Sequence, residues 1–91
     1  MTYPETFGIA AFRSRQQVMR FDSALKRAGL RSEVISTPRE VSMGCGLSVR
    51  FDLNDAERVM NIYRRSRPEN LIGMYQVEMN GNGRPTVTPM V

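Results

Sequence analysis

The sequence predicts an α+β domain with a ferredoxin-like β-α-β-β-α-β order, an antiparallel sheet carrying two helices on one face. Two segments have apolar residues at helical spacing, and short apolar or alternating segments that are typical of strands flank each of them. A length of 91 residues allows one modest core but not two. We therefore expect a single domain over residues 1–80, followed by a segment 81–91 that forms a flexible tail or an edge strand.

The chain should begin with a strand and a helix. The apolar run of residues 7–12 is typical of a buried strand. Ser14 and Gln17 have the spacing of a capping box, which marks the start of a helix. Gly29 suits a left-handed cap at its end, so the helix should span about residues 15–28.

Two strands joined by a loop are expected next. The first covers residues 31–36 and ends before Pro38, which cannot donate a ladder hydrogen bond. Residues 38–44 form the loop. Apolar residues then alternate with polar or small ones, the clearest strand pattern in the sequence, at Cys45, Leu47, Val49 and Phe51.

A second helix and a last strand complete the predicted domain. Asn54 followed by Glu57 repeats the capping-box spacing, and Pro68 ends the helix. Residues 71–79 alternate again and should form a strand, and the Asn and Gly residues at 80–83 are typical of a turn. The sheet face opposite the helices would be open in a monomer, and such sheets commonly cover a face or an edge by self-association.

The chain contains one cysteine, Cys45, and no histidine. An intramolecular disulfide, a Ser-His or Cys-His catalytic pair and a zinc site built from one chain are therefore excluded. We expect no metal and no cofactor. Any chemistry must use the thiol or groups from a partner.

Composition favours a cytoplasmic protein that is not embedded in a membrane. No apolar run approaches the roughly 20 residues of a bilayer span, and the N-terminus lacks the pattern of a secretory signal. The net charge is +4 and Lys26 is the only lysine, so arginine dominates the basic residues. This balance favours solubility or an anionic ligand.

The surroundings of Cys45 suit a stabilised thiolate. Arg39 lies six residues upstream, and Gly44 and Gly46 flank the cysteine, where their backbone amides could turn toward an anion. Ser42 could donate a further hydrogen bond. The alternative is structural: Cys45 is in phase with the apolar residues of its strand and could be a buried small hydrophobe, while Arg39 pairs with a surface glutamate, Glu33 or Glu40.

The segment 35–51 resembles the central motif of the Se/S carrier protein-like family, small proteins long grouped as a domain of unknown function. The resemblance extends over about residues 7–77 and is most specific over 37–47, where Pro38, Arg39 and Ser42 precede Cys45-Gly46. It implies a carrier or accessory protein, rather than a stand-alone enzyme, that holds sulfur or selenium on Cys45. Its partners would be donor and acceptor proteins.

Two alternatives remain from other classes. A domain of this element order could bind RNA, using arginines for phosphate contacts, although its strands offer few aromatic residues for base stacking. The candidate arginines are Arg13, Arg15, Arg20, Arg64, Arg65 and Arg67. The domain could instead form a homo-oligomer through its open sheet face, or bind a small ligand, with methionines as adaptable contacts. These are Met19, Met43, Met60, Met74, Met79 and Met90.

Overall fold

A computed structural model describes residues 5–39, 41, 46–66, 71–79 and 85–90 of the chain. These residues form five strands, two α-helices and one 3₁₀ turn. In chain order they are β1 (Thr6–Phe12), α1 (Arg15–Arg27), β2 (Ser32–Ser36), β3 (Leu47–Phe51), η1 (Leu53–Asp55), α2 (Ala56–Ser66), β4 (Leu71–Met79) and β5 (Pro85–Pro89).

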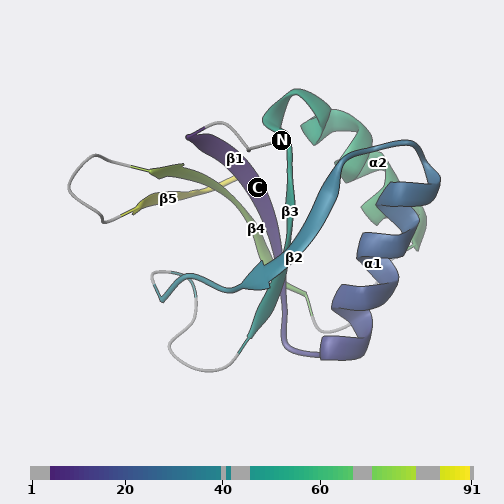
Figure 1. Cartoon of the computed structure of the whole chain (residues 1–91), viewed down its shortest axis with the longest axis horizontal. Helices are drawn as coiled ribbons and strands as arrows, with labels where there is room; N and C mark the ends of the chain where they lie inside the picture. The colour runs from purple at the N-terminus through teal and green to yellow at the C-terminus, as the bar shows by residue number, and fades with distance from the viewer. Residues whose placement is uncertain (1–4, 40, 42–45, 67–70, 80–84, 91) are drawn as a thin grey trace.

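The five strands form one antiparallel sheet in the order β2-β3-β1-β4-β5. Both helices pack on the same side of this sheet (Figure 1). The predicted α+β class is therefore confirmed, but the sheet has one strand more than the four of the predicted arrangement. Strand β5 lies in the segment 81–91, for which the sequence predicts either a flexible tail or an edge strand. It is an edge strand, and it pairs with β4 through Val77 and Val87.

The signals at the ends of α1 act as predicted. Ser14 is the N-cap, and its hydroxyl oxygen accepts a hydrogen bond from the Gln17 backbone N–H at 3.4 Å. At the other end, Gly29 has a φ of 83°, in the left-handed region that a residue with a Cβ adopts at a cost. The helix ends at Arg27, one residue before the predicted position.

The start of α2 differs from the prediction. Asn54 is not its cap. Instead, the Asp52 carboxylate accepts a hydrogen bond from the Asn54 backbone N–H at 2.9 Å and caps the 3₁₀ turn that leads into the helix at Ala56. Because Phe51 is the last residue of β3 and is fully buried, the chain turns directly after it, and Asp52 is the first side chain that can cap.

Apolar residues are buried on both faces of the sheet. The larger cluster lies between the sheet and the helices and includes Phe12, Val49 and Phe51. A smaller cluster of Phe7, Ile9 and Val77 lies on the opposite face. The central residues of that face are buried within the single chain, so it is less open than the sequence predicts.

Partly buried side chains pack against the smaller cluster from several elements of the chain. They are Ile35 from β2, Val41 from the loop that follows it, Tyr75 from β4 and Val87 from β5. The loop before Cys45 is thereby tied to the sheet face that the helices do not cover.

Candidate functional site

The predicted site lies on the connection between β2 and β3, and the base of this connection is closed by hydrogen bonds. Ser36 and Leu47 are the last paired residues of the two strands. Beyond them, the Thr37 backbone N–H donates to the Gly46 carbonyl at 3.0 Å. Gly46 directly follows Cys45 in the sequence. The neighbour of the cysteine is therefore held by a backbone hydrogen bond at the end of the sheet.

A buried pair of hydroxyl groups reinforces this base. The Thr37 and Ser48 side chains form a hydrogen bond of 2.7 Å between Oγ1 and Oγ, and Ser48 is completely shielded from solvent. Neither residue stands out in the sequence as a candidate. Their diagonal placement in the β2–β3 pair follows from the register, in which Thr37 faces Gly46, two residues before Ser48.

Gly46 lies so close to its neighbours that a side chain would fit tightly, and its backbone conformation is not left-handed. A Cβ on this residue would lie 3.2 Å from the Thr37 Oγ1 and 3.8 Å from the Phe12 carbonyl oxygen. Its φ is not in the positive region that Gly29 occupies. The sequence predicts that Gly46 turns a backbone amide toward an anion. Because Gly46 does not adopt the left-handed conformation, its backbone gives no support to this role.

The first half of the loop begins with a turn. The Val41 backbone N–H donates to the Pro38 carbonyl at 3.0 Å, which places exposed Arg39 at the turn. Glu33, one of the two surface partners considered for Arg39, forms an ion pair with Arg50 instead. The structure therefore gives no support to a pairing of Arg39 with Glu33.

Four residues of the predicted loop, and the cysteine that follows it, lie outside the described residues: Glu40, Ser42, Met43, Gly44 and Cys45. The roles of Cys45, Ser42 and Gly44 therefore stay predictions, as does the choice between a reactive thiol and a buried one. Of the remaining site residues, the structure brings Pro38, Arg39 and Gly46 onto one loop at one end of the sheet.

The connection from β1 to α1 lies at this same end of the sheet. Phe12 is paired with Leu47, and its carbonyl oxygen borders the space that a Cβ on Gly46 would take. Arg13 follows Phe12 directly and is exposed, and the N-cap of α1 comes next at Ser14. In the sequence, Arg13 is only a candidate phosphate contact. The antiparallel pairing of β1 with β3 places Arg13 at the same end of the sheet as the loop, and this pairing could have identified Arg13 as a site residue.

Two grooves on the surface are lined by residues away from the loop. The larger, of about 710 Å³, lies along α1, and a smaller one of about 250 Å³ lies between α2 and β4. Neither includes a described loop residue. Within the described ranges, there is no group of three His, Cys, Asp or Glu residues that could hold a metal ion, and neither helix has the length and apolar character needed to cross a bilayer.

Comparison with known proteins gives one family. The family model described as "Putative Se/S carrier protein-like" matches residues 7–71 of the chain, from β1 to the first residue of β4. The matched region contains the whole β2–β3 loop. A search of curated proteins found no significant match.

Proposed function

The chain belongs to the Se/S carrier protein-like family, and we propose that Cys45 is its carrier thiol, which holds a persulfide or a perselenide for transfer to an acceptor protein. The observation that carries this proposal is the anchored loop: a cysteine stands next to Gly46, which is fixed between the buried Thr37–Ser48 pair and the end of β1.

The proposed chemistry consists of two exchanges at sulfur. The Cys45 thiolate attacks the outer sulfur or selenium of a donor persulfide or perselenide, the donor's bond to that atom breaks, and the donor leaves as its thiolate. An acceptor thiolate then attacks the outer atom on Cys45 and regenerates the free thiol. The transferred atom keeps its oxidation level, so no oxidant, reductant or metal takes part.

Two exposed arginines support the anionic forms in this proposal. Arg39 lies in the turn that opens the loop, and Arg13 follows the β1 residue whose carbonyl borders Gly46. A nearby cation favours a thiolate over a thiol, and it equally favours the terminal anion of a persulfide. Pro38, Ser42, Gly44 and Gly46 would set the conformation of the loop, with Ser42 as a further hydrogen-bond donor.

Mass spectrometry of the intact protein tests the proposal. The full chain is incubated with a cysteine persulfide donor, and the adduct is then located by digestion. We expect an increase of one sulfur on Cys45, and its loss when a low-molecular-weight thiol is added as acceptor. A Cys45→Ser variant is the matched control, because it is similar in size and lacks the thiol. An adduct level that is the same in this variant, or no adduct on Cys45, overturns the proposal.

The two alternative functions gain less support from the described residues. Base stacking on the sheet requires exposed aromatic rings, yet Phe7, Phe12 and Phe51 in the strands are buried, and Tyr75 is partly buried. Self-association through the sheet face is weakened as a proposal because the centre of this face is buried within one chain. Size-exclusion chromatography of the wild type and of Cys45→Ala measures the oligomeric state independently of the thiol.

The same proposal includes the finer fold class. We infer that β1 to β4 and the two helices form a ferredoxin-like unit to which β5 is added at the β4 edge. The supporting features are the predicted element order, the antiparallel pairing and the position of β1 between β3 and β4.

A further inference from the structure

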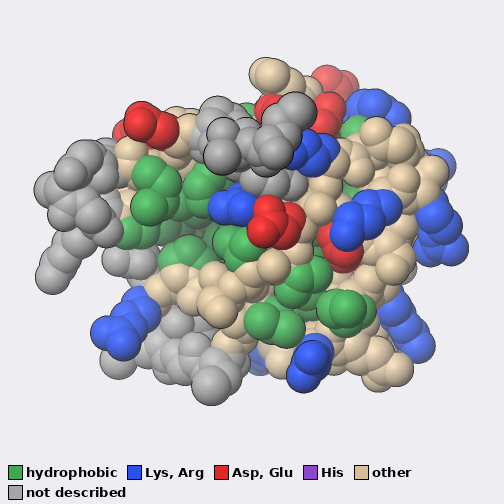
Figure 2. Space-filling model, viewed as in Figure 1, with side chains coloured by type: hydrophobic (Ala, Val, Ile, Leu, Met, Phe, Trp, Pro, Cys, Tyr) green, Lys and Arg blue, Asp and Glu red, His purple; other side chains and the backbone are tan. Residues whose placement is uncertain are grey.

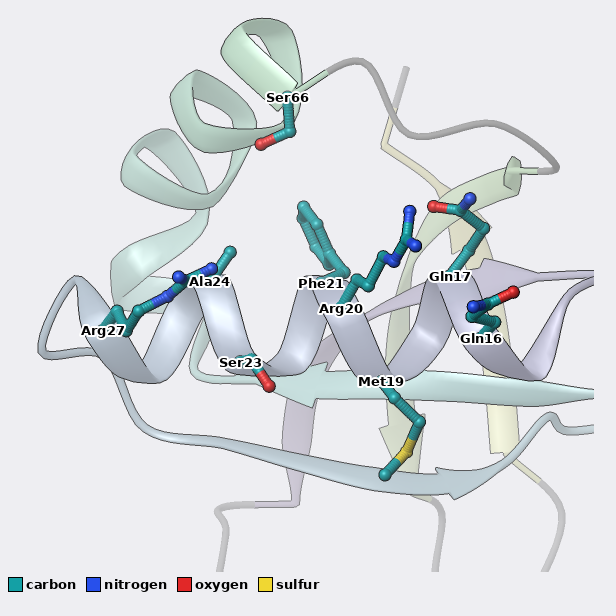
Figure 3. Close-up of a pocket in the computed structure, with 9 residues that line it drawn as sticks. All are labelled: Gln16, Gln17, Met19, Arg20, Phe21, Ser23, Ala24, Arg27 and Ser66. Atoms are coloured by element: carbon teal, nitrogen blue, oxygen red, sulfur yellow. The ribbon is translucent and has the colours of Figure 1, made fainter.

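The larger groove lies on the helical side of the molecule, and of the described residues that line it all but Ser66 belong to α1. It extends along the helix from Gln16 to Arg27, and Ser66 at the end of α2 contributes to its wall. In Figure 3, Gln17 and Phe21 extend from α1 on the side of Ser66, while Met19 extends from the opposite side of the helix. The outer surface of α1 thus forms the floor of an open groove about 16 Å long, at 1.5 Å of rise per residue.

This groove is positively charged. Arg20 and Arg27 line it, and both are exposed. They are seven residues apart, so they lie on the same side of α1 with about 10 Å between them along the axis. None of the described residues that line the groove is acidic.

The helical layer around the groove has the same sign of charge. Figure 2 shows basic side chains along this side of the molecule. The two helices contain seven basic residues against the acidic Asp22 and Glu57, and Asp22 is buried. The basic residues are Arg15, Arg20, Lys26, Arg27, Arg58, Arg64 and Arg65.

The groove also offers apolar contact beside its charges. Met19 is one of two large hydrophobic side chains that are exposed among the described residues, and half of its surface is accessible to solvent. Ala24 is partly buried and also lines the groove, together with the buried Phe21. Methionine side chains adapt their shape readily to an apolar partner.

We propose that this groove binds an acidic amphipathic helix of a partner protein. Two carboxylates seven residues apart on such a helix would contact Arg20 and Arg27, and apolar residues on either side of the carboxylates would contact Met19 on one flank of the arginines and Ala24 on the other. A nucleic acid would use the arginines but gain little from Met19, and the described part of the groove has no exposed aromatic ring on which a base could stack. A protein helix uses both features.

The proposed surface and Val41 of the loop are on different sides of the sheet. The groove belongs to the helical layer, whereas Val41 of the loop packs on the opposite face. A bound partner helix would therefore leave Val41 and the sheet face on which it packs uncovered. The inference does not depend on the carrier chemistry, because no residue of the groove belongs to the loop.

A designed peptide tests the proposal with the full chain. The probe is a 14-residue helical peptide with two glutamates seven residues apart and leucines at the third and fourth positions between them. Fluorescence anisotropy gives its Kd, and ¹⁵N chemical shifts give its location. We expect shifts confined to residues 16–27 and Ser66. The double variant Arg20→Glu/Arg27→Glu should raise the Kd on the order of tenfold or more, because attraction is replaced by repulsion.

Matched controls separate the groove from general charge. Arg39→Glu makes the same change in charge per residue on the loop, and we expect it to change the Kd by less than about twofold, since Arg39 does not line the groove and salt screens exposed charges. A peptide with both glutamates changed to glutamine should bind on the order of tenfold more weakly. The circular dichroism of each variant should match the wild type, because the substituted arginines are exposed, and a slightly lower melting temperature is expected where Glu replaces Arg27 in the last turn of α1.

Several results would overturn the proposal. The first two are no binding of the peptide at millimolar concentration, and an equal Kd for the glutamate and the glutamine peptides. The others are a rise in Kd in Arg39→Glu as large as that in the double variant, and chemical-shift changes spread over the whole helical layer. Tighter binding of a ten-nucleotide uridine RNA than of the peptide, at the same residues, would also overturn it and assign the surface to nucleic acid. If the peptide binds Cys45→Ser as well as the wild type, the groove acts independently of the thiol, as proposed.

Discussion

The Thr37 and Ser48 hydroxyl groups are hydrogen-bonded to each other at 2.7 Å in a site from which solvent is excluded, directly below the loop that contains Cys45. Each hydroxyl group provides the hydrogen-bond partner of the other in a place that water does not reach. The pair therefore joins Thr37, the first residue after β2, to Ser48 within β3, and holds the two ends of the loop together beside the last strand pair, Ser36 and Leu47.

Removal of one hydroxyl should destabilise the fold more than removal of both. Thr37→Val preserves the shape of the side chain but leaves the buried Ser48 oxygen without its partner, which costs about 1–3 kcal/mol of the free energy of unfolding. Ser48→Ala should have a similar cost. The double variant should cost less than either single variant, and urea denaturation of all four proteins gives the coupling energy. Costs that add to within about 0.5 kcal/mol would show that the two residues do not interact.

Gly8 should be intolerant of a side chain because the Phe51 ring covers it. The two residues are paired across β1 and β3, and a Cβ on Gly8 would lie 2.4 Å from the ring. Phe51 is fully buried and cannot move away, so Gly8→Ala should lower the stability by about 1–3 kcal/mol, as overpacking does. Thermal unfolding measures the loss.

A second glycine gives a matched control for this effect. A Cβ on Gly73 would also be too close to a ring, at 2.7 Å from the Tyr75 hydroxyl oxygen, but Tyr75 is only partly buried and can rotate toward solvent. Gly73→Ala should therefore cost less than Gly8→Ala. Phe51→Leu introduced together with Gly8→Ala should recover part of the loss. Equal costs for the two glycines would contradict the role assigned to the buried ring.

The parts of the fold with strong local signals could be predicted from the sequence. The alternation pattern lies within β3 itself, and the capping residues Ser14 and Gly29 directly flank α1. Each signal is therefore local to the element that it predicts. Strand β5 has weak signals of its own, because it begins and ends with proline. Its pairing depends on the exposed edge of β4, and this edge becomes available only once the rest of the sheet has formed.

The candidate site was predicted less completely, for a similar reason. The local motif of Arg39, Cys45 and Gly46 was visible in the sequence, but the partnership of Thr37 with Ser48 depends on the register across a long loop. The alternation pattern put Ser48 on a polar face, although the residue is fully buried. Burial of this face by residues from the loop and from β5 is a tertiary effect that no local pattern contains.

The buried Asp22 should contribute through its hydrogen bond to β2 more than through its ion pair. Its carboxylate accepts a hydrogen bond from the Ser32 hydroxyl at 2.6 Å, and Lys26 lies 2.9 Å away within α1. The Lys26 side chain is 57% exposed, so water and ions screen its charge. Asp22→Ala should therefore cost about 1–3 kcal/mol, while Lys26→Ala should cost less than about 1 kcal/mol. Chemical denaturation checks both, and a larger loss in the lysine variant would contradict the assignment.

Arg39 and Arg13 should both increase the reactivity of Cys45 if the thiol is the carrier. Each arginine is exposed and at the loop end of the sheet, and a cation near a thiol increases the thiolate fraction. An exposed charge contributes about 0.2–1 kcal/mol, so Arg39→Ala or Arg13→Ala should slow alkylation by iodoacetamide at pH 7 by about 1.4- to 5-fold. Arg27→Ala is the control, because Arg27 lies at the far end of α1 from the loop and its loss should leave the rate unchanged. The difference should shrink at high salt, where exposed charges are screened. An equal decrease in all three variants would indicate an effect of net charge, and no decrease in any would remove both arginines from the proposed site.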